Sequence, residues 1–134
     1  MSSNEKTTDL VKYRLKNSKE KLSSAKVLLE NGKFKDSISR SYYAMFTAAR
    51  ALLATKHLDS SKHTGVISLF NQHFIKTGVV AKEFGRMLMK GKDLRQDSDY
   101  KDFVETSMEE AQDQYNDAKK FIEQIEDILN QLAY

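Results

Sequence analysis

The feature that most constrains this chain of 134 residues is the absence of proline, together with the presence of only 5 glycines. Proline and glycine interrupt helices and form most tight turns, so a chain that nearly lacks both favours long helices. No stretch alternates apolar and polar residues with the β-branched enrichment that is typical of strands. The sequence therefore predicts an all-α fold.

The length and composition are those of one globular domain. Apolar residues make up 40% of the chain and charged residues 31%, a balance typical of folded domains rather than of disordered or membrane-spanning chains. We therefore treat residues 1–134 as a single domain, with residues 1–6 expected to be disordered. The first ten residues are polar, and no apolar run approaches the ~18 residues that a membrane span needs. We expect a cytoplasmic protein without membrane contact.

Apolar periodicity predicts five helices separated by short connections. Their expected ranges are 7–31, 34–56, 61–75, 81 to the polar run 96–99, and from the capping residue Ser107 onward. Short connections place consecutive helices antiparallel, so the predicted architecture is an up-and-down bundle of four to five helices. In the second helix a stripe of small side chains should let neighbouring helices approach closely, which predicts a central position for it. The stripe consists of Ser37, Ser41, Ala44, Ala48 and Ala51.

A third face of the second helix carries Tyr43, Phe46 and Arg50 at spacings of three and four. Two aromatic side chains and an arginine in a row are more than solvation of a helix requires. Either they are partly buried, with the Arg50 head group reaching solvent, or they form an interface with a partner or with a second copy of the chain.

The net charge of +3 hides an uneven distribution. Residues 1–100 carry 19 basic and 10 acidic side chains, whereas residues 101–134 carry 3 basic and 9 acidic ones. Either the acidic last helix packs against a basic body, or the basic body is a surface for a polyanion such as RNA. Composition alone leaves both interpretations open.

The sequence contains no motif for a metal, a bound cofactor or an activated serine. Cysteine is absent, which excludes disulfides and thiolate ligands. The HExxH, phosphate-loop and GxSxG patterns are missing as well, so we expect neither metal nor cofactor. His63 lies in the first turn of a predicted helix, where the helix dipole disfavours its charged form. Its expected role is a hydrogen bond that ties the loop to the helix.

The main cluster of candidate functional side chains lies in the fourth helix. Its basic residues are Arg86, Lys90, Lys92 and Arg95. Arg95 and Asp99 are four residues apart and form an ion pair if the helix persists. Alternatively, Arg95 binds a phosphate, with Tyr100 stacking or donating a hydrogen bond nearby. The four basic residues and Arg50 are therefore the candidates for binding a nucleic acid or a nucleotide.

The segment 39–53, SRSYYAMFTAARALL, resembles the second-helix motif of HEPN (higher-eukaryote and prokaryote nucleotide-binding) domains. Three further pieces, residues 63–66, 70–74 and 95–100, follow in the order of that family, so the resemblance covers roughly residues 8–130. It implies a four- to five-helix bundle, commonly dimeric, with the functional cleft between protomers. It also implies a toxin encoded beside a small nucleotidyltransferase that acts as antitoxin. Many such toxins are metal-independent ribonucleases that use an arginine followed four to six residues later by a histidine.

That histidine is missing here. Arg95 matches the arginine, but residues 100–102 are Tyr, Lys and Asp, and no histidine follows His73. The ending formed by Arg95, Asp99 and Tyr100 is similar to the branch of the family without the nuclease histidine. The resemblance then implies binding of a minimal nucleotidyltransferase, of a second copy, and of RNA or a nucleotide, without efficient nuclease activity. Tyr100 is in addition a candidate for modification by that partner.

Two other functions remain open at this point. The first is a metal-independent ribonuclease toxin whose candidate catalytic residues are Arg95, Asp99 and Tyr100, with His57 or His63 supplied across a dimer interface. The second is a non-catalytic helical interaction module, in which the uneven charge only holds the last helix to the bundle.

Overall fold

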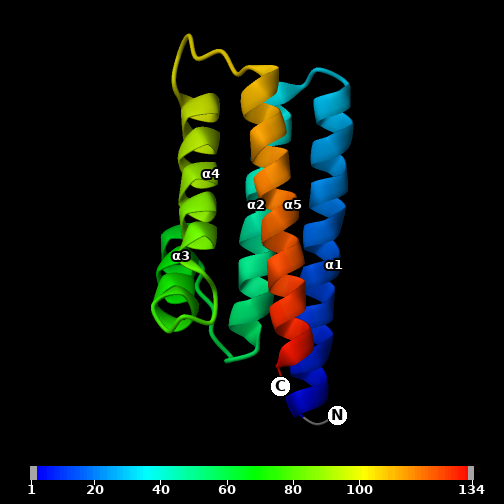
Figure 1. Cartoon of the computed structure of the whole chain (residues 1–134), viewed down its shortest axis with the longest axis vertical. Coiled ribbons are helices and arrows are strands. Elements are labelled where there is room, and N and C mark those ends of the chain that lie inside the picture. The colour runs from blue at the N-terminus through cyan, green and yellow to red at the C-terminus, as the bar shows by residue number, and fades with distance from the viewer. Residues whose placement is uncertain (1–2, 133–134) are drawn as a thin grey trace.

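Five α-helices make up most of the protein, and the computed structural model, which describes residues 3–132, contains no strand there. The helices are α1 (Ser3–Glu30), α2 (Phe34–Ala54), α3 (His63–Phe70), α4 (Lys82–Tyr100) and α5 (Met108–Gln131), with a π-helical segment η1 (Asn71–Ile75) after α3. The four long helices run up and down along the long axis, and the described chain begins and ends at the same end of the bundle (Figure 1). The predicted all-α bundle is confirmed.

Two predicted helix boundaries are wrong. The helix α1 begins at Ser3 rather than Thr7, so residues 3–6, which we expected to be disordered, are helical; residues 1 and 2 lie outside the described residues. The helix α4 continues through the polar run 96–99 to Tyr100. Two ion pairs between residues four apart, Arg95–Asp99 and Lys101–Asp97, support this extra turn.

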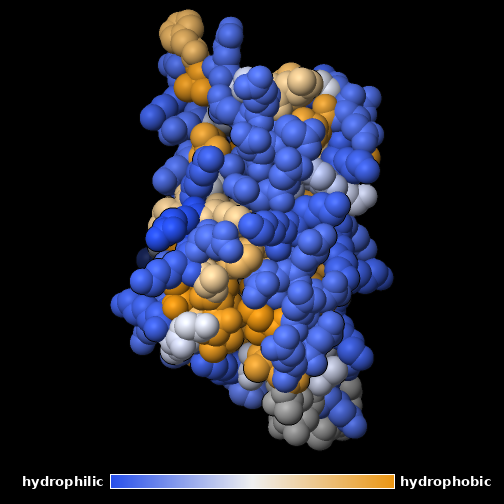
Figure 2. Space-filling model, viewed as in Figure 1, coloured by the Kyte–Doolittle hydropathy of each residue, from blue (hydrophilic) through white to orange (hydrophobic). Residues whose placement is uncertain are grey.

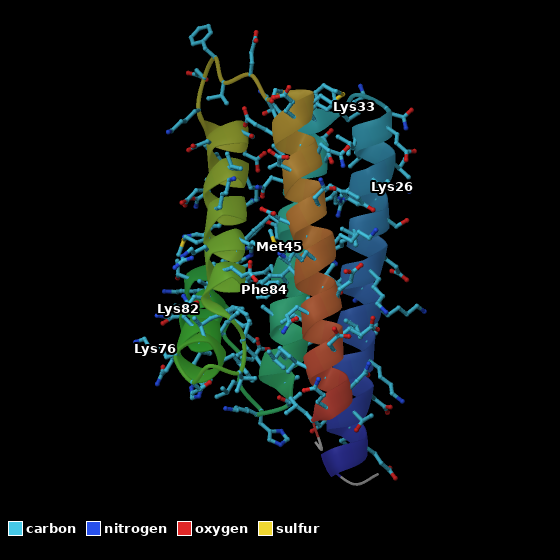
Figure 3. All side chains as sticks on the ribbon, viewed as in Figure 1. Lys26, Lys33, Met45, Lys76, Lys82 and Phe84 are labelled. Atoms are coloured by element: carbon cyan, nitrogen blue, oxygen red, sulfur yellow. The ribbon has the colours of Figure 1, made fainter. Side chains whose placement is uncertain are left out.

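The helix α2 is the centre of the bundle, as its small side chains predicted. It packs against α1, α3, α4 and α5, and all five residues of the small stripe are fully buried. Small side chains leave room for close neighbours on two sides, which places the larger Tyr42 and Met45 in the core. Met45 lies between the helices in the middle of the bundle, as does Phe84 of α4 (Figure 3).

Two ion pairs of opposite polarity join α5 to its neighbours. Lys19 of α1 bonds to Glu126, while Lys120 of α5 pairs with Glu83 of α4. The face seen in Figure 2 is mostly hydrophilic, with an apolar area low on it. Ser107 caps α5 as predicted, because its Oγ accepts a hydrogen bond of 3.1 Å from the Glu110 amide. Within residues 3–132, no helix is both long and apolar enough to cross a membrane.

Candidate anion-binding site

A cavity of about 260 Å³ lies where α2, the start of α3 and the second half of α4 meet. We call it the His63 pocket. Its lining residues are Tyr43, His63, Thr64, Lys92, Arg95 and Gln96. Two fixed positive charges and one imidazole therefore face a space that is large enough for a phosphate group.

The imidazole of His63 is held from two directions by side chains of α2. The Tyr42 hydroxyl lies 3.1 Å from His63 Nδ1, and the Phe46 ring stacks on the imidazole with centroids 4.2 Å apart. Tyr43 meets the same ring edge-on at 5.6 Å. These contacts tie the start of α3 to α2, whereas the predicted bond joined the loop to the helix that His63 begins. They leave Nε2 as the ring nitrogen that is available to a ligand.

The first turn of α3 packs so closely on the preceding loop that Gly65 has no room for a Cβ. A Cβ built on Gly65 would lie 2.1 Å from Ser60 Oγ, so any larger residue would push the loop away from α3. Ser60 in turn accepts a hydrogen bond of 3.2 Å from the Lys62 amide, which fixes the backbone directly before His63. The position of the imidazole is thus set by the loop as well as by α2.

The charges around the pocket keep His63 neutral. Burial lowers the pKa of His63, and the positive charges of Arg95, Lys92 and Arg50 lower it further. Burial raises the pKa of Tyr42 to about 12, with Tyr43 adding to the rise and Arg95 opposing it. The Tyr42 hydroxyl therefore keeps its proton at neutral pH. When this hydroxyl donates to His63 Nδ1, the proton of the neutral ring lies on Nε2.

Arg95 enters the pocket beside the two tyrosines. Its guanidinium carbon lies 5.0 Å from the Tyr43 ring centroid and 5.9 Å from that of Tyr42, which is within cation–π range. Its Nε lies 3.4 Å from Asp99 Oδ2, close enough for an ion pair but without hydrogen-bond geometry. The Arg95 side chain is 17% exposed. Most of its donors therefore have no acceptor bound to them within the described chain.

Gly91 allows α4 to approach α2 and α5 closely at this level. A Cβ there would lie 2.7 Å from Met45 Cε and 3.5 Å from Tyr42 Cδ1. The glycine does not interrupt the helix, since α4 is continuous through it. Instead it sets the depth at which the next turn, with Lys92 and Arg95, meets the pocket.

The other predicted binding residues lie elsewhere. Arg50 is paired with Asp59, at 3.0 Å between Nη2 and Oδ2, although its charge still reaches His63. Burial raises the pKa of Asp117 of α5, and the charge of Lys90 partly opposes that rise. Arg86 is exposed on α4 outside the pocket lining. Of the five predicted cations, the structure brings only Lys92 and Arg95 into one cavity.

Of the three candidate catalytic residues, the structure brings two together. Asp99 lies beside Arg95, whereas Tyr100 is 75% exposed and does not line the pocket. Tyr100 follows Arg95 by five positions, which is about 140° around a helix. Tyr100 therefore lies on another side of α4 than Arg95, and its contact with a phosphate bound at Arg95 stays a prediction.

The interface interpretation is wrong for Phe46. Its side chain is only 7% exposed, because the start of α3 returns across this face of α2 and places His63 on the ring. The alternative of partial burial describes it. Tyr43 and Arg50 are partly exposed, and a role of these two residues in an interface stays a prediction.

Sequence reasoning missed that His63 and Arg95 share a pocket within one chain. The sequence predicted a structural hydrogen bond for His63 within the chain, and a role in the site only as a residue supplied across a dimer interface. The two residues are 32 positions apart, and only the path of the short α3 brings them together. The available signal was the run His63-Thr64-Gly65, in which a histidine lies two residues before a glycine at the start of a predicted helix.

The fold and the pocket define a small all-α protein with a cation-lined cavity. Across residues 3–132, no three His, Cys, Asp or Glu side chains converge in a way that could hold a metal ion. The chain belongs to the HEPN domain family, whose model matches residues 11–128.

Named relatives point to the same family. The chain is 39% identical over 113 residues to a protein of Methanocaldococcus jannaschii named as a putative toxin, with 84% of each chain covered. It is 37% identical over 123 residues to a UPF0332 protein of Thermotoga maritima, covering 92% of this chain and 93% of the relative. A UPF0332 protein of Pyrococcus horikoshii is 50% identical over 78 residues, which is 58% of this chain and 55% of that one.

Proposed function

We propose that this HEPN protein is the toxin-like member of a two-component system. In this system it binds a minimal nucleotidyltransferase in the cytoplasm and holds RNA or a nucleotide by its phosphate in the His63 pocket. The family membership and the relative named as a putative toxin support the toxin-like part. The convergence of Lys92 and Arg95 on one cavity carries the binding part.

The charge of the pocket suits a phosphate better than a neutral ligand. Arg95 presents a planar array of donors, and charge-assisted bonds from arginine to phosphate are among the stronger hydrogen bonds in proteins. Asp99 offsets one positive charge at a distance of 3.4 Å, while Lys92 has no comparable acidic neighbour in the pocket lining. An anion between the two cations would balance the excess charge.

We propose binding rather than efficient cleavage for this pocket. A general base needs an unprotonated nitrogen directed at the reacting hydroxyl. In the tautomer in which Tyr42 donates to His63 Nδ1, the proton lies on Nε2. The neutral ring is then a hydrogen-bond donor to the ligand and lacks a free basic nitrogen.

The nucleotidyltransferase and a second copy of the chain would bind different surfaces near the His63 pocket. Tyr100 lies at the end of α4 with 75% of its surface exposed, so a nucleotidyltransferase could reach its hydroxyl. Tyr43 and Arg50 are the remaining candidates for a homodimer interface. Because Tyr43 also lines the His63 pocket, a dimer formed there would cover one wall of the ligand site.

RNA binding by purified variants tests the proposal. We expect Arg95→Ala to lower the affinity for a short RNA by about tenfold or more at low salt, and Lys92→Ala to lower it less. Arg86→Ala is the matched control, because it removes an exposed charge of the same helix outside the pocket. Equal losses for Arg95→Ala and Arg86→Ala would show that the pocket is not the binding site.

Co-purification tests the partner. A nucleotidyltransferase encoded beside this protein should form a complex with it, and the complex should protect Tyr100 from chemical modification. Failure to form a complex at micromolar concentrations would contradict the two-component assignment and would leave RNA binding to be judged separately.

One observation favours ribonuclease activity as a second function: His63 and Arg95 line the same cavity. If the tautomer reverses, His63 Nε2 becomes a base beside a phosphate-binding arginine. RNA cleavage in the presence of a metal chelator, lost in both Arg95→Ala and His63→Ala and kept in Tyr100→Phe, would establish this function. Cleavage that survives both alanine variants would place the activity elsewhere.

A further inference from the structure

The His63 pocket places an imidazole beside several cationic side chains, and burial together with their charges lowers the pKa of His63. The groups that face His63 come from two helices: Tyr42, Tyr43 and Arg50 from α2, and Lys92 and Arg95 from α4. Three of these five residues, Arg50, Lys92 and Arg95, are cations. In the empty pocket the imidazole is therefore surrounded by positive charge.

The two acidic residues nearby do not cancel this field. Asp59 is engaged by Arg50 through two hydrogen bonds of 3.0 and 3.3 Å and also by Arg14. Asp99 meets Arg95 at a single distance of 3.4 Å. No acidic side chain lines the cavity itself. Lys92 is thus the cation most in need of an anionic ligand, and His63 lies across the cavity from it.

An incoming phosphate would place negative charge beside His63 and favour its protonated form. A phosphodiester within an RNA strand brings one negative charge, whereas a terminal phosphate carries −1.5 to −2 near pH 7, because its second pKa is about 6. Lys92, Arg95 and a protonated His63 can together balance a dianion, but they exceed what a single diester charge requires. The cavity of about 260 Å³ is large enough for one phosphate group.

The contacts of the imidazole are compatible with both its neutral and its protonated form. Phe46 stacks on one face of the ring, with an interplanar angle of 21°, and Tyr42 engages Nδ1. The ring is therefore held with Nε2 as its free polar atom in either charge state. Tyr42 can donate to Nδ1 when the ring is neutral, and it can accept from Nδ1–H when the ring is charged.

We propose that the His63 pocket binds a terminal phosphate, the phosphomonoester of a nucleotide or of an RNA end, through Lys92, Arg95 and the Nε2–H of His63, and that His63 takes up a proton as this ligand binds. The inference rests on the proposed function in that it uses the same pocket for an anion. It goes further in stating that a terminal phosphate is preferred to a phosphodiester and that His63 distinguishes the two.

The direction of the pH dependence follows from linkage. The bound ligand raises the pKa of His63 above its lowered value in the free protein. Affinity therefore increases as the pH falls from the pKa of the bound state toward the pKa of the free state. Each unit of rise in the pKa corresponds to about tenfold tighter binding by the protonated form. Below about pH 6 the ligand itself loses its second charge, so affinity should level off there.

The test compares one short RNA in two forms, with a 5′-phosphate and with a 5′-hydroxyl, and adds a 3′-phosphorylated form and a nucleoside 5′-monophosphate. We expect a phosphorylated ligand to bind about tenfold more tightly than the hydroxyl form at pH 6.5, with a smaller preference at pH 8.5. Which phosphorylated ligand binds best distinguishes a free nucleotide from a 5′ or a 3′ RNA end. Imidazole NMR signals should show the pKa of His63 rising on saturation, with His57 and His73 of the same protein as internal references.

The matched variant is His63→Gln, which keeps a side-chain NH donor but cannot titrate. It should retain part of the phosphate preference and lose the change between pH 6.5 and pH 8.5. The NMR measurement uses the unaltered protein, so it stands even if this variant is unstable.

The possible failures are distinguishable. Equal binding of phosphorylated and hydroxyl RNA, with binding still lost in Arg95→Ala, would overturn this inference and leave the proposed function intact. A His63 pKa that does not rise with a saturating phosphorylated ligand would overturn proton uptake. No binding of any of the ligands, with no difference for Arg95→Ala, would overturn the proposed function as well.

Discussion

Two clusters of basic side chains differ in how their charges are paired. The first cluster is Arg14 and Arg50 with Asp59, and the second is Lys92 and Arg95. In the first cluster, Arg14 and Arg50 share Asp59: Arg14 Nη2 lies 3.1 Å and Arg50 Nη2 lies 3.0 Å from the same carboxylate oxygen. Arg14 Nη1 also donates to the Arg50 carbonyl at 3.0 Å. In the second cluster, Arg95 has one acidic neighbour at 3.4 Å without hydrogen-bond geometry.

The difference separates a structural cluster from a binding cluster. In the first, the donors are used to tie α1, α2 and the loop before α3 together, and the side chains are oriented by one another. In the second, Arg95 and Lys92 border a cavity and leave donors for a ligand. Counting basic residues on a helix does not distinguish the two cases, because the distinction lies in where the acceptors are.

The largest expected change comes from the side chain behind the second cluster. Phe46→Ala should lower the free energy of unfolding by about 3 kcal/mol, because it removes a buried ring that also supports His63. Urea denaturation measures the loss. Phe103→Ala is the control, since Phe103 is fully exposed and its truncation should change stability by less than about 0.5 kcal/mol. Similar losses for both variants would contradict the packing that positions the imidazole.

The next test asks whether Arg95 of the second cluster contributes to binding rather than to stability. Arg95→Ala should abolish most RNA binding while changing the unfolding free energy by less than about 1 kcal/mol. The reverse pattern, a large loss of stability with binding retained, would mean that Arg95 belongs with the structural cluster. Fluorescence anisotropy and thermal melting on the same samples separate the two outcomes.

Asp59→Asn should show the opposite behaviour. Removal of the carboxylate leaves Arg14 and Arg50 facing each other, and we expect a loss of about 1 kcal/mol of stability, moderated by solvent because Asp59 is half exposed. RNA affinity should change by less than about twofold. A tenfold change in affinity would show that the first cluster also contacts the ligand.

Acid should weaken the first cluster in a defined direction. Burial acts to raise the pKa of Asp59, but hydrogen bonds from Arg50 and the Ser60 amide, with the charges of Arg50 and Arg14, outweigh it and lower the pKa below its usual value. A lowered pKa gives stability that is present above the unfolded value of about 4 and is lost as the pH falls through the folded value. The stability difference between wild type and Asp59→Asn should therefore shrink below about pH 4. A difference that stays constant down to pH 2 would contradict the ion pairs.

Much of the fold was predictable because local rules act on whole helices. The absence of proline and the small stripe of α2 predicted long helices around a central one, and Ser107 predicted the start of α5. The end of α4 was not predictable from its polar composition. The residues 96–99 favour a turn in isolation, but two ion pairs between side chains four apart keep them helical.

The candidate site was predictable only in part. Arg95 and Asp99 follow from helical spacing, and Lys92 lies on the same side of α4. The burial of Phe46 depends on where the short α3 returns, which no periodicity in α2 encodes. The same return brings His63 to Arg95. The family motif places its histidine a few residues after Arg95 on the same helix. It does not indicate that His63, from another segment of the same chain, lies in the same pocket as Arg95.

The most direct test of the two-cluster account is an NMR map of the protein saturated with a 5′-phosphorylated RNA. The account predicts that the largest shifts occur at His63, Lys92 and Arg95, while the side-chain signals of Arg14 and Arg50 stay in place. Shifts centred on Arg14 and Arg50, with the His63 pocket unchanged, would contradict it.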